Sequence, residues 1–400
     1  MLRALTPFAM IFVSIAFQTC LTAQEASDTR VAYDRWENGV SSDPDYFPIA
    51  VWLQSPHNAE RFKQAGINLY IGLWNGPTEE QLVALQRAGM PVICSQNDLA
   101  MNSEHADLIV GWMHGDEPDN AQAIRGGGYG PPIEPSVIEK QYNQIKMRDP
   151  TRPILLNLGQ GVAYDNYIGR GVRRNHPEDY PLYIRGSDIV SFDIYPAVHD
   201  KPEVAGKLEF VPRGVERLRR WSKDEKIVWN CIEASRIGNK EVKPTAKQIR
   251  AEVWMSLIRG SRGLIYFVHQ FKPTFKEASL LSDPELLSAV TSINRQVIQL
   301  APVLNSRDIT DAIVFASPLQ ETSIQVLVKR YQGSLYLLAS NESPNSATAV
   351  LQVAVPLADG AKLKPIGSES PIEIRDSKIG LELPGYGIGL YRIQESSPRP

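Results

Sequence analysis

The sequence has few cysteines and no recognisable metal or phosphate motif. Its three cysteines are Cys20, Cys94 and Cys231, and the last two lie within apolar runs, so we expect buried free thiols and no disulfide framework. The six histidines lack a metal-ligand spacing such as His-Glu-x-x-His, and no Gly-x-x-x-x-Gly-Lys loop is present. The sequence therefore predicts no metal site, no organic cofactor and no cysteine chemistry.

Strong net charge and membrane-length apolar runs are also missing. Lys+Arg 42 against Asp+Glu 45 leaves a net charge of −3, which gives no electrostatic case for a nucleic-acid partner. The apolar run Phe8–Phe17 follows Arg3, is too short to span a bilayer, and precedes the small residues Thr22 and Ala23. This pattern predicts a signal peptide over residues 1–23 and a secreted or periplasmic protein without stable membrane insertion. A disordered tail, a buried helix and a lipoprotein signal ending at Cys20 are the alternatives.

From about residue 47 the sequence alternates short β-rich runs with longer helical patterns, which is typical of parallel βα units. Most of the runs are continuously apolar, as expected for strands covered by helices. Eight such repeats over about 250 residues favour a (β/α)8 TIM barrel of the α/β class over an open doubly wound sheet. The predicted strands are Phe47–Gln54, Asn68–Trp74, Pro91–Gln96, Leu108–His114, Ile154–Leu158, Ile189–Tyr195, Lys226–Ile232 and Leu264–His269.

The pattern changes after Asn305, where short β-type runs are separated by turn chemistry. We predict a barrel domain over residues 24–305 and a small antiparallel C-terminal β-sandwich over residues 306–400. Its expected role is to pack against the barrel, with sugar binding as the alternative. The predicted sandwich strands are Ser323–Val328, Ser334–Leu338, Thr348–Val355 and Ile388–Ile393.

Two glutamates directly follow apolar strands, at the barrel end where catalytic groups gather. Glu117 follows the fourth predicted strand, and Glu233 follows the seventh. Cleavage of a glycosidic bond requires one carboxylic acid and one carboxylate on the two sides of the bond. We expect these glutamates to reach toward each other across the barrel mouth, with salt-bridged structural acids as the alternative.

The Asp116-Glu117-Pro118 sequence resembles the Asn-Glu-Pro of the clan A (4/7 superfamily) glycoside hydrolases, and the resemblance covers about residues 40–305. It implies a retaining mechanism with Glu117 as acid/base and Glu233 as nucleophile, and it identifies no family within the clan. Asp116 departs from the pattern, because the usual Asn binds the sugar 2-hydroxyl. Asp116 either accepts from that hydroxyl or raises the pKa of Glu117 by like charge.

Further candidates lie at the ends of other strands. The resemblance implies that Tyr195 hydrogen-bonds the nucleophile, and Asp193, which points the same way by period-two alternation, is expected to brace the mouth. Aromatic side chains stack on the apolar faces of sugars, so those near strand ends are candidates for a sugar cleft, with packing as the alternative. The predicted substrate-binding residues are Asp116, Tyr195, Phe271, Trp52, Trp74 and His269.

Two long connections are expected to build the walls of the cleft. The loop after the fourth strand contains the glycine-rich segment Arg125–Pro132 and is expected to form a flexible wall. The loop Gly159–Tyr180 carries Arg170, Arg173 and Arg174. Arginine pairs with carboxylate and sulfate in a fork geometry, so this cluster raises the hypothesis of an anionic sugar. A solvated charged loop is the favoured alternative.

The sequence thus predicts a secreted retaining glycosidase that degrades a poly- or oligosaccharide. A non-catalytic carbohydrate-binding barrel is the main alternative. A metal-assisted hydrolase using His114, Asp116 and Glu117 is a third interpretation, disfavoured because adjacent residues in an extended chain point to opposite faces.

Overall fold

The computed structural model describes residues 32–317, 322–367 and 370–395 and contains the predicted parallel barrel. The strand order is β7-β6-β5-β4-β3-β2-β1-β9-β8. The chain continues from β7 through Trp229 into β8, so the strand that pairs with β6 at one end pairs with β9 at the other and closes the barrel. The strands are β1 (Ile49–Trp52), β2 (Leu69–Ile71), β3 (Val92–Cys94), β4 (Ile109–Met113), β5 (Ile154–Leu158), β6 (Ile189–Phe192), β7 (Ile227–Val228), β8 (Asn230–Glu233) and β9 (Leu264–Phe267).

Alternate residues of each strand face the barrel interior and the surrounding helices. Along the seventh strand position, Ile227, Trp229 and Cys231 pack in the interior cluster. Val228 and Ile232 belong to the clusters that include helix side chains. Both faces are buried, which explains why the strands are almost continuously apolar in sequence.

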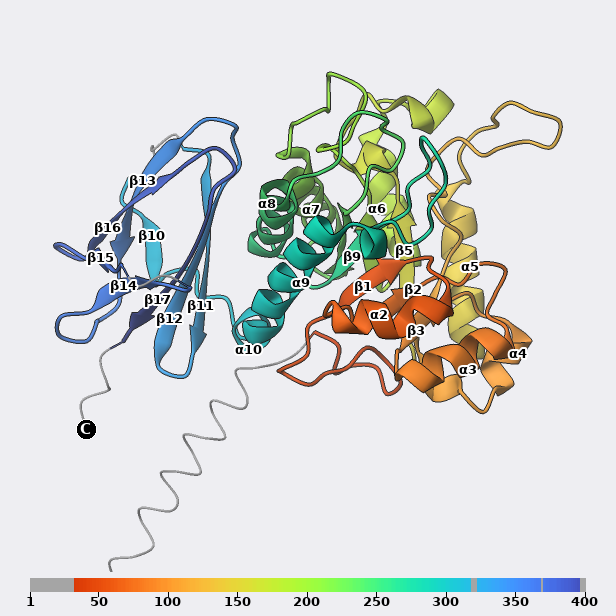
Figure 1. The fold of residues 1–400 in the computed structure, drawn as a ribbon, viewed down its shortest axis with the longest axis horizontal. Helices are drawn as coiled ribbons and strands as arrows, with labels where there is room; N and C mark the ends of the chain where they lie inside the picture. The colour runs from red at the N-terminus through yellow and green to blue at the C-terminus, as the bar shows by residue number, and fades with distance from the viewer. Residues whose placement is uncertain (1–31, 318–321, 368–369, 396–400) are drawn as a thin grey trace, which may run out of the picture.

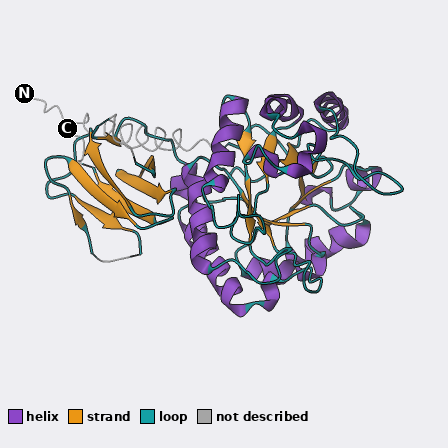
Figure 2. Ribbon diagram, turned by 90° about the horizontal axis from the view of Figure 1, so that it is seen from above, coloured by secondary structure: helices purple, strands orange, loops and turns teal. Residues whose placement is uncertain are grey.

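Helices surround the strands (Figure 2). Capping boxes at Thr78 and Thr245 fix the starts of α3 and α8. Each threonine side chain accepts a hydrogen bond from the backbone N–H three residues later, and the glutamine at that position accepts one from the backbone N–H of the threonine. The helices are α2 (Ala59–Gln64), α3 (Glu79–Ala88), α4 (Asp98–Asn102), α5 (Pro135–Arg148), α6 (Tyr180–Tyr183), α7 (Phe210–Ser222), α8 (Ala246–Ile258), α9 (Pro284–Gln299) and α10 (Ala301–Asn305).

The C-terminal region is the predicted antiparallel sandwich, set to one side of the barrel (Figure 1). A three-stranded and a five-stranded sheet share one apolar core. The four predicted runs form β11, β12, β13 and β17, whereas β10, β14, β15 and β16 were not predicted, three of them because they are only two to four residues long. The strands are β10 (Ile313–Phe315), β11 (Ile324–Tyr331), β12 (Ser334–Asn341), β13 (Ala347–Val353), β14 (Lys362–Pro365), β15 (Ile372–Glu373), β16 (Lys378–Leu383) and β17 (Ile388–Gln394).

The sandwich contacts the barrel through α8. Arg259 donates two hydrogen bonds of 2.7 Å to the Glu342 carboxylate, and Leu338 and Leu390 join the core cluster of the barrel. A bidentate pair of this kind fixes orientation as well as contact. The predicted signal peptide, residues 1–23, lies outside the described residues, and none of the described helices has the length and apolar character needed to cross a membrane.

Candidate active site at the barrel mouth

Glu117 occupies a strained backbone position just beyond β4. Its φ is 44°, in the left-handed region that residues other than glycine rarely adopt. Backbone bonds on both sides hold it there: its N–H donates to the carbonyl of Asn157 at 3.2 Å, and its carbonyl accepts from Asn120 at 3.0 Å. Such conformations cost about 1–3 kcal/mol and cluster at functional sites. The fold therefore fixes the direction of the Glu117 side chain at an energetic cost.

The side chain of Glu117 forms a carboxyl pair with Asp193, which follows β6. Burial, followed by the charge of Asp193, holds the pKa of Glu117 well above its usual range. Burial raises the pKa of Asp193 to about 7, although a hydrogen bond from Glu117 lowers it. Glu117 therefore carries the shared proton and donates it toward the Asp193 carboxylate. Both residues are only partly buried, although Oδ1 of Asp193 is itself buried and has no hydrogen-bond partner among the described residues.

Tyr195 supports this pair from the same segment. Its buried hydroxyl hydrogen-bonds to Asp193 and lowers the pKa of that carboxyl. The resemblance implied a bond from Tyr195 to the nucleophile, and its observed acidic partner is Asp193. The Tyr195 ring also contacts Phe267, with ring centroids 5.2 Å apart, which links the acid pair to the aromatic side chains beyond β9.

Asp116 lies beside the pair and accepts a hydrogen bond of 2.9 Å from the Asn157 side chain. The oxygen of that amide accepts from the Ser191 hydroxyl at 2.7 Å, so its orientation is fixed. Although Asp116 is exposed at the mouth, the protein around its carboxyl displaces water and raises its pKa. The charge of Asp116 also raises the pKa of Glu117, but less than the charge of Asp193 does. Like-charge repulsion, one of the two roles considered for Asp116, therefore acts on Glu117, but it is weaker than the repulsion from Asp193.

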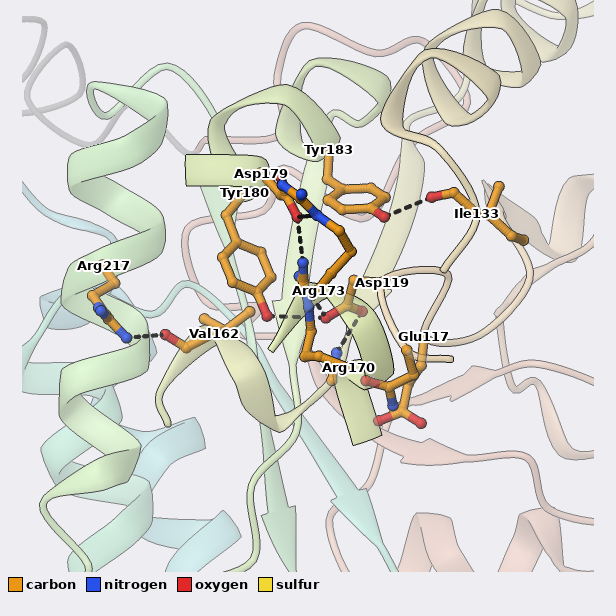
Figure 3. A network of polar contacts seen from close by, with 12 residues as sticks. Glu117, Asp119, Ile133, Val162, Arg170, Arg173, Asp179, Tyr180, Tyr183 and Arg217 are labelled. Carbon is orange, nitrogen blue, oxygen red and sulfur yellow. Dashed lines mark hydrogen bonds and ion pairs between the residues drawn. The ribbon is translucent and has the colours of Figure 1, made fainter. Parts of the chain in front are cut away.

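A buried polar network braces the turn that carries Glu117 (Figure 3). Asp119 accepts a hydrogen bond from the backbone N–H of Gly159 at 2.9 Å and another from the Tyr180 hydroxyl at 3.1 Å. The Arg170 guanidinium, 1% exposed, lies 3.8 Å from Asp119 and 2.5 Å from Asp179. The loop after β5 is therefore held firmly against the turn after β4.

Arg170 and Arg173 of this loop are paired with an acid of the same loop, Asp179. Arg173 donates two hydrogen bonds to Asp179, at 2.9 and 2.5 Å, which is the fork geometry considered for an anionic sugar. Arg174 contacts Asn166, and His176 contacts Glu178. Asp179 thus binds both the fork of Arg173 and the buried guanidinium of Arg170. The cationic cluster is therefore not a preformed anion site.

Glu233 has other partners than Glu117. The side chain of Glu233 is 0% exposed, and its two oxygens accept from the backbone N–H groups of Ala197 and Val198 at 2.6 and 3.0 Å. Its acidic partner is Glu252 of α8, whereas the acids that raise the pKa of Glu117 are at other positions. No hydrogen bond joins the two glutamates among the described residues, and their meeting across the mouth stays a prediction.

The physical reason lies just beyond β6. The strand ladder has ended there, so the N–H groups of Ala197 and Val198 are free to bind a carboxylate, which draws Glu233 between this loop and α8. Burial raises the pKa of Glu233 to about 7, and burial together with the charge of Glu233 holds the pKa of Glu252 well above its usual range. Glu252 therefore carries the proton of this second pair. The role of Glu233 as nucleophile remains a prediction that this placement does not favour.

An aromatic cleft of about 840 Å³ opens beside the acid pair. It brings together most of the predicted substrate-binding residues, because Trp52, Trp74, His269, Phe271 and Asp116 all line it. Trp74 is 70% exposed and Phe271 50% exposed, whereas Trp52 and His269 are buried at its wall. The rings of His269 and Phe271 stack with centroids 6.1 Å apart.

Further residues of this cleft were not predicted. Phe267, Phe275 and Gln54 also line it. Phe275 is 62% exposed and lies 5.9 Å from the Phe271 ring, ring centroid to ring centroid. Its signal in the sequence was a second aromatic four residues after Phe271 in an otherwise polar loop. Asp193 was noticed by its alternation, but it was expected only to brace the mouth.

The third interpretation, a metal-assisted hydrolase, has no structural basis at its proposed ligands. His114 is buried, and a nitrogen of its ring lies 2.7 Å from the carbonyl of Gly186, so it does not join Asp116 and Glu117. Within the described ranges, no group of three or more His, Cys, Asp or Glu side chains could hold a metal ion.

Comparison with known proteins supports the fold. No protein-family model matches the sequence, and no curated protein matches it. An α-amylase from Geobacillus thermoleovorans, complexed with acarbose, is similar over 88% of this chain and 99% of that chain, with a TM-score of 0.50 and 11% identity. A proposed α-galactosidase from Bacteroides fragilis is similar over 88% of this chain and 80% of that chain, with a TM-score of 0.50 and 10% identity. At these identities the likeness shows the fold alone, and the predicted barrel class is confirmed.

Proposed function

We propose that this protein is a retaining glycoside hydrolase in which Glu117 is the acid/base and Asp193 is the nucleophile. The observation that carries the proposal is the partly buried Glu117–Asp193 pair, next in sequence to Asp116, which lines an aromatic cleft. The two similar solved structures bear the names of glycosidases, which is consistent with the proposal.

The protonation of the pair supports these roles. Protonated Glu117 can donate to the glycosidic oxygen, and ionised Asp193 can attack the anomeric carbon. The C–O bond to the leaving alcohol breaks as the bond to Asp193 forms, which gives a glycosyl ester. Ionised Glu117 then takes a proton from water, the water oxygen attacks the anomeric carbon, and Asp193 leaves as a carboxylate. No metal or organic cofactor is required for these steps.

The closeness of the pair supports retention over inversion. Inverting enzymes keep their two carboxyls about 6.5–9.5 Å apart to admit a water, whereas retaining enzymes keep them about 5–5.5 Å apart. Carboxyls that hydrogen-bond to each other leave no room for a water between them. A sugar that enters would separate the two groups and take the proton of Glu117.

The proposal is tested by assaying a panel of oligosaccharides with the wild type and with Glu117→Gln and Asp193→Asn. We expect hydrolysis of at least one glycan by the wild type and loss of that activity in both variants, with Glu139→Gln on the exposed face of α5 as the control. Binding of a glycan without hydrolysis would support the non-catalytic carbohydrate-binding barrel and would overturn the enzymatic proposal.

We further propose that residues 1–23 form a signal peptide and that the protein is secreted or periplasmic. Expression of the full chain, fractionation of the cells and N-terminal sequencing of the mature protein test this. A mature N-terminus close to residue 24 outside the cytoplasm is expected. Retention of the intact N-terminus in the cytoplasm would contradict it.

A further inference from the structure

Gln54 is a buried amide with an unused acceptor at the wall of the cleft. It is 1% exposed, lines the cleft, and its Oε1 has no partner among the described residues. Its Nε2 lies 3.1 Å from the carbonyl of Glu277, 3.1 Å from a ring nitrogen of His269 and 3.5 Å from the carbonyl of Trp52. Because a carbonyl can only accept, the amide orientation is fixed and Oε1 remains the free end. A buried acceptor without a partner is costly, so a donor from a ligand would be favoured there.

The carboxylates of the cleft are also hydrogen-bond acceptors, and they carry negative charge. Its carboxylates are Glu80, Asp116 and Glu277, and among the described residues no lysine or arginine lines it. Hydrogen bonds from its own backbone N–H and from Thr78 lower the pKa of the exposed Glu80, so this carboxylate is ionised over most of the pH range. In the adjoining groove, Arg87 lies among Glu60, Glu79 and Glu80. The cleft therefore offers many acceptors and excess negative charge.

We propose that this cleft selects sugar rings that present hydrogen-bond donors and carry no negative charge, with Gln54 as a specificity-determining acceptor. This inference rests on the proposed function, because it concerns the substrate of the same site. The exposed rings of Trp74, Phe271 and Phe275 supply the apolar surface on which a sugar face stacks. Gln54 and the carboxylates accept from ring hydroxyls or from the ammonium of an amino sugar, whereas a uronate or sulfate would meet like charge without a cation to offset it.

Binding is measured by calorimetry with the inactive Glu117→Gln protein, so that the result does not depend on turnover. The probes form two sets that differ in charge. The first set is cello-oligosaccharides (uncharged), chitosan oligomers (cationic) and C6-oxidised cello-oligosaccharides (carboxylated). The second set is galacto-oligosaccharides (uncharged) and oligogalacturonides (carboxylated). We expect binding of at least one uncharged or amino-sugar probe, and at least tenfold weaker binding of its carboxylated analogue at low salt. Binding that occurs while the wild type hydrolyses nothing would sustain this inference and defeat the proposed function.

Three variants assign the effect to the cleft. Trp74→Ala, at a side chain 70% exposed, should keep the fold and weaken binding up to about tenfold. Gln54→Leu should weaken binding about three- to tenfold if its thermal midpoint shows that it folds. Glu80→Lys should reduce the difference in affinity between uncharged and carboxylated probes. Glu104→Lys, at an exposed position outside the cleft, should leave that difference unchanged.

The contrary results are equally specific. The assignment would be overturned if carboxylated probes bound equally or more tightly, or if no probe bound. It would also be overturned if Glu80→Lys and Glu104→Lys changed the difference in affinity between uncharged and carboxylated probes by the same amount.

Discussion

Two proton-sharing acid pairs lie near the mouth of this barrel, and they differ in what surrounds them. Glu117 and Asp193 are partly buried, Glu117 has a strained backbone, and its neighbour Asp116 lines the cleft. The pair of Glu233 and Glu252 is essentially without exposed surface, and Glu233 is bound by two backbone N–H groups. In both pairs burial is the largest cause of the raised pKa values. A perturbed pKa therefore identifies neither pair as catalytic, and the remaining exposure of Glu117 and Asp193 distinguishes the two pairs.

The comparison also assigns a use to the enclosed pair. Glu233 binds the backbone N–H groups of Ala197 and Val198, two and three residues beyond Tyr195, and its hydrogen bond with Glu252 connects this segment to α8. The segment that carries Asp193 and Tyr195 is thereby fixed at its end. We infer that the enclosed pair positions the accessible one and does not contact substrate.

The largest expected effect is on catalysis. Glu117→Gln should lower kcat/KM by about 10²–10⁴-fold, because general acid–base catalysis is worth that much. Its thermal midpoint should stay the same or rise, since the variant removes a buried acid beside another acid. Steady-state kinetics and thermal unfolding measure both quantities, with Glu139→Gln on α5 as the matched exposed control. Comparable activity in Glu117→Gln and the control would contradict the claim that the Glu117–Asp193 pair is the catalytic one.

The second effect is on stability. Glu252→Ala should lower the free energy of unfolding by about 3–5 kcal/mol, because it leaves Glu233 as a buried charge without its partner. Glu252→Gln should cost much less, since its amide can still donate to Glu233. Urea unfolding at one pH compares the two variants with Glu241→Ala at an exposed position before α8. If alanine and glutamine at position 252 proved equivalent, the hydrogen bond to Glu233 would not be the stabilising contact.

The third effect is the pH dependence of stability. Burial raises the folded-state pKa of Glu252 well above its ordinary value of 4.5, so its contribution to stability is fully present below about 4.5 and is lost as the pH rises through the folded-state pKa. Glu252→Gln removes this loss. Its stability relative to wild type should therefore improve by about 1.4 kcal/mol per pH unit above that point. Urea unfolding across this range measures the slope, and a difference that stays constant with pH would show that Glu252 does not hold its proton in the native state.

The smallest effect concerns Asp116. Asp116→Asn removes a negative charge that raises the pKa of Glu117 less than the charge of Asp193 does, so that pKa should fall and the basic limb of kcat/KM should move to lower pH. A basic limb that does not move in Asp116→Asn would leave Asp116 with substrate binding as its role.

The sequence predicted the barrel well because its strands are buried on both faces and their apolar runs are unambiguous. It located Asp116, Glu117 and the cleft aromatics because residues that follow such strands share one end of the barrel. It did not predict the hydrogen bonds of Glu233, since strand position alone does not tell which unpaired N–H groups compete for a carboxylate. Glu252 was hidden within an apolar helix stripe, and the self-pairing of Arg170 and Arg173 depends on loop geometry that no motif encodes.

The central claim is that Asp193, and not Glu233, is the partner of Glu117. It is tested most directly by trapping the glycosyl-enzyme with a 2-fluoro glycosyl fluoride of the sugar that the panel identifies, followed by peptide mapping with mass spectrometry. The account predicts a label on the peptide that contains Asp193, absent in Asp193→Asn. A label on Glu233 would contradict it.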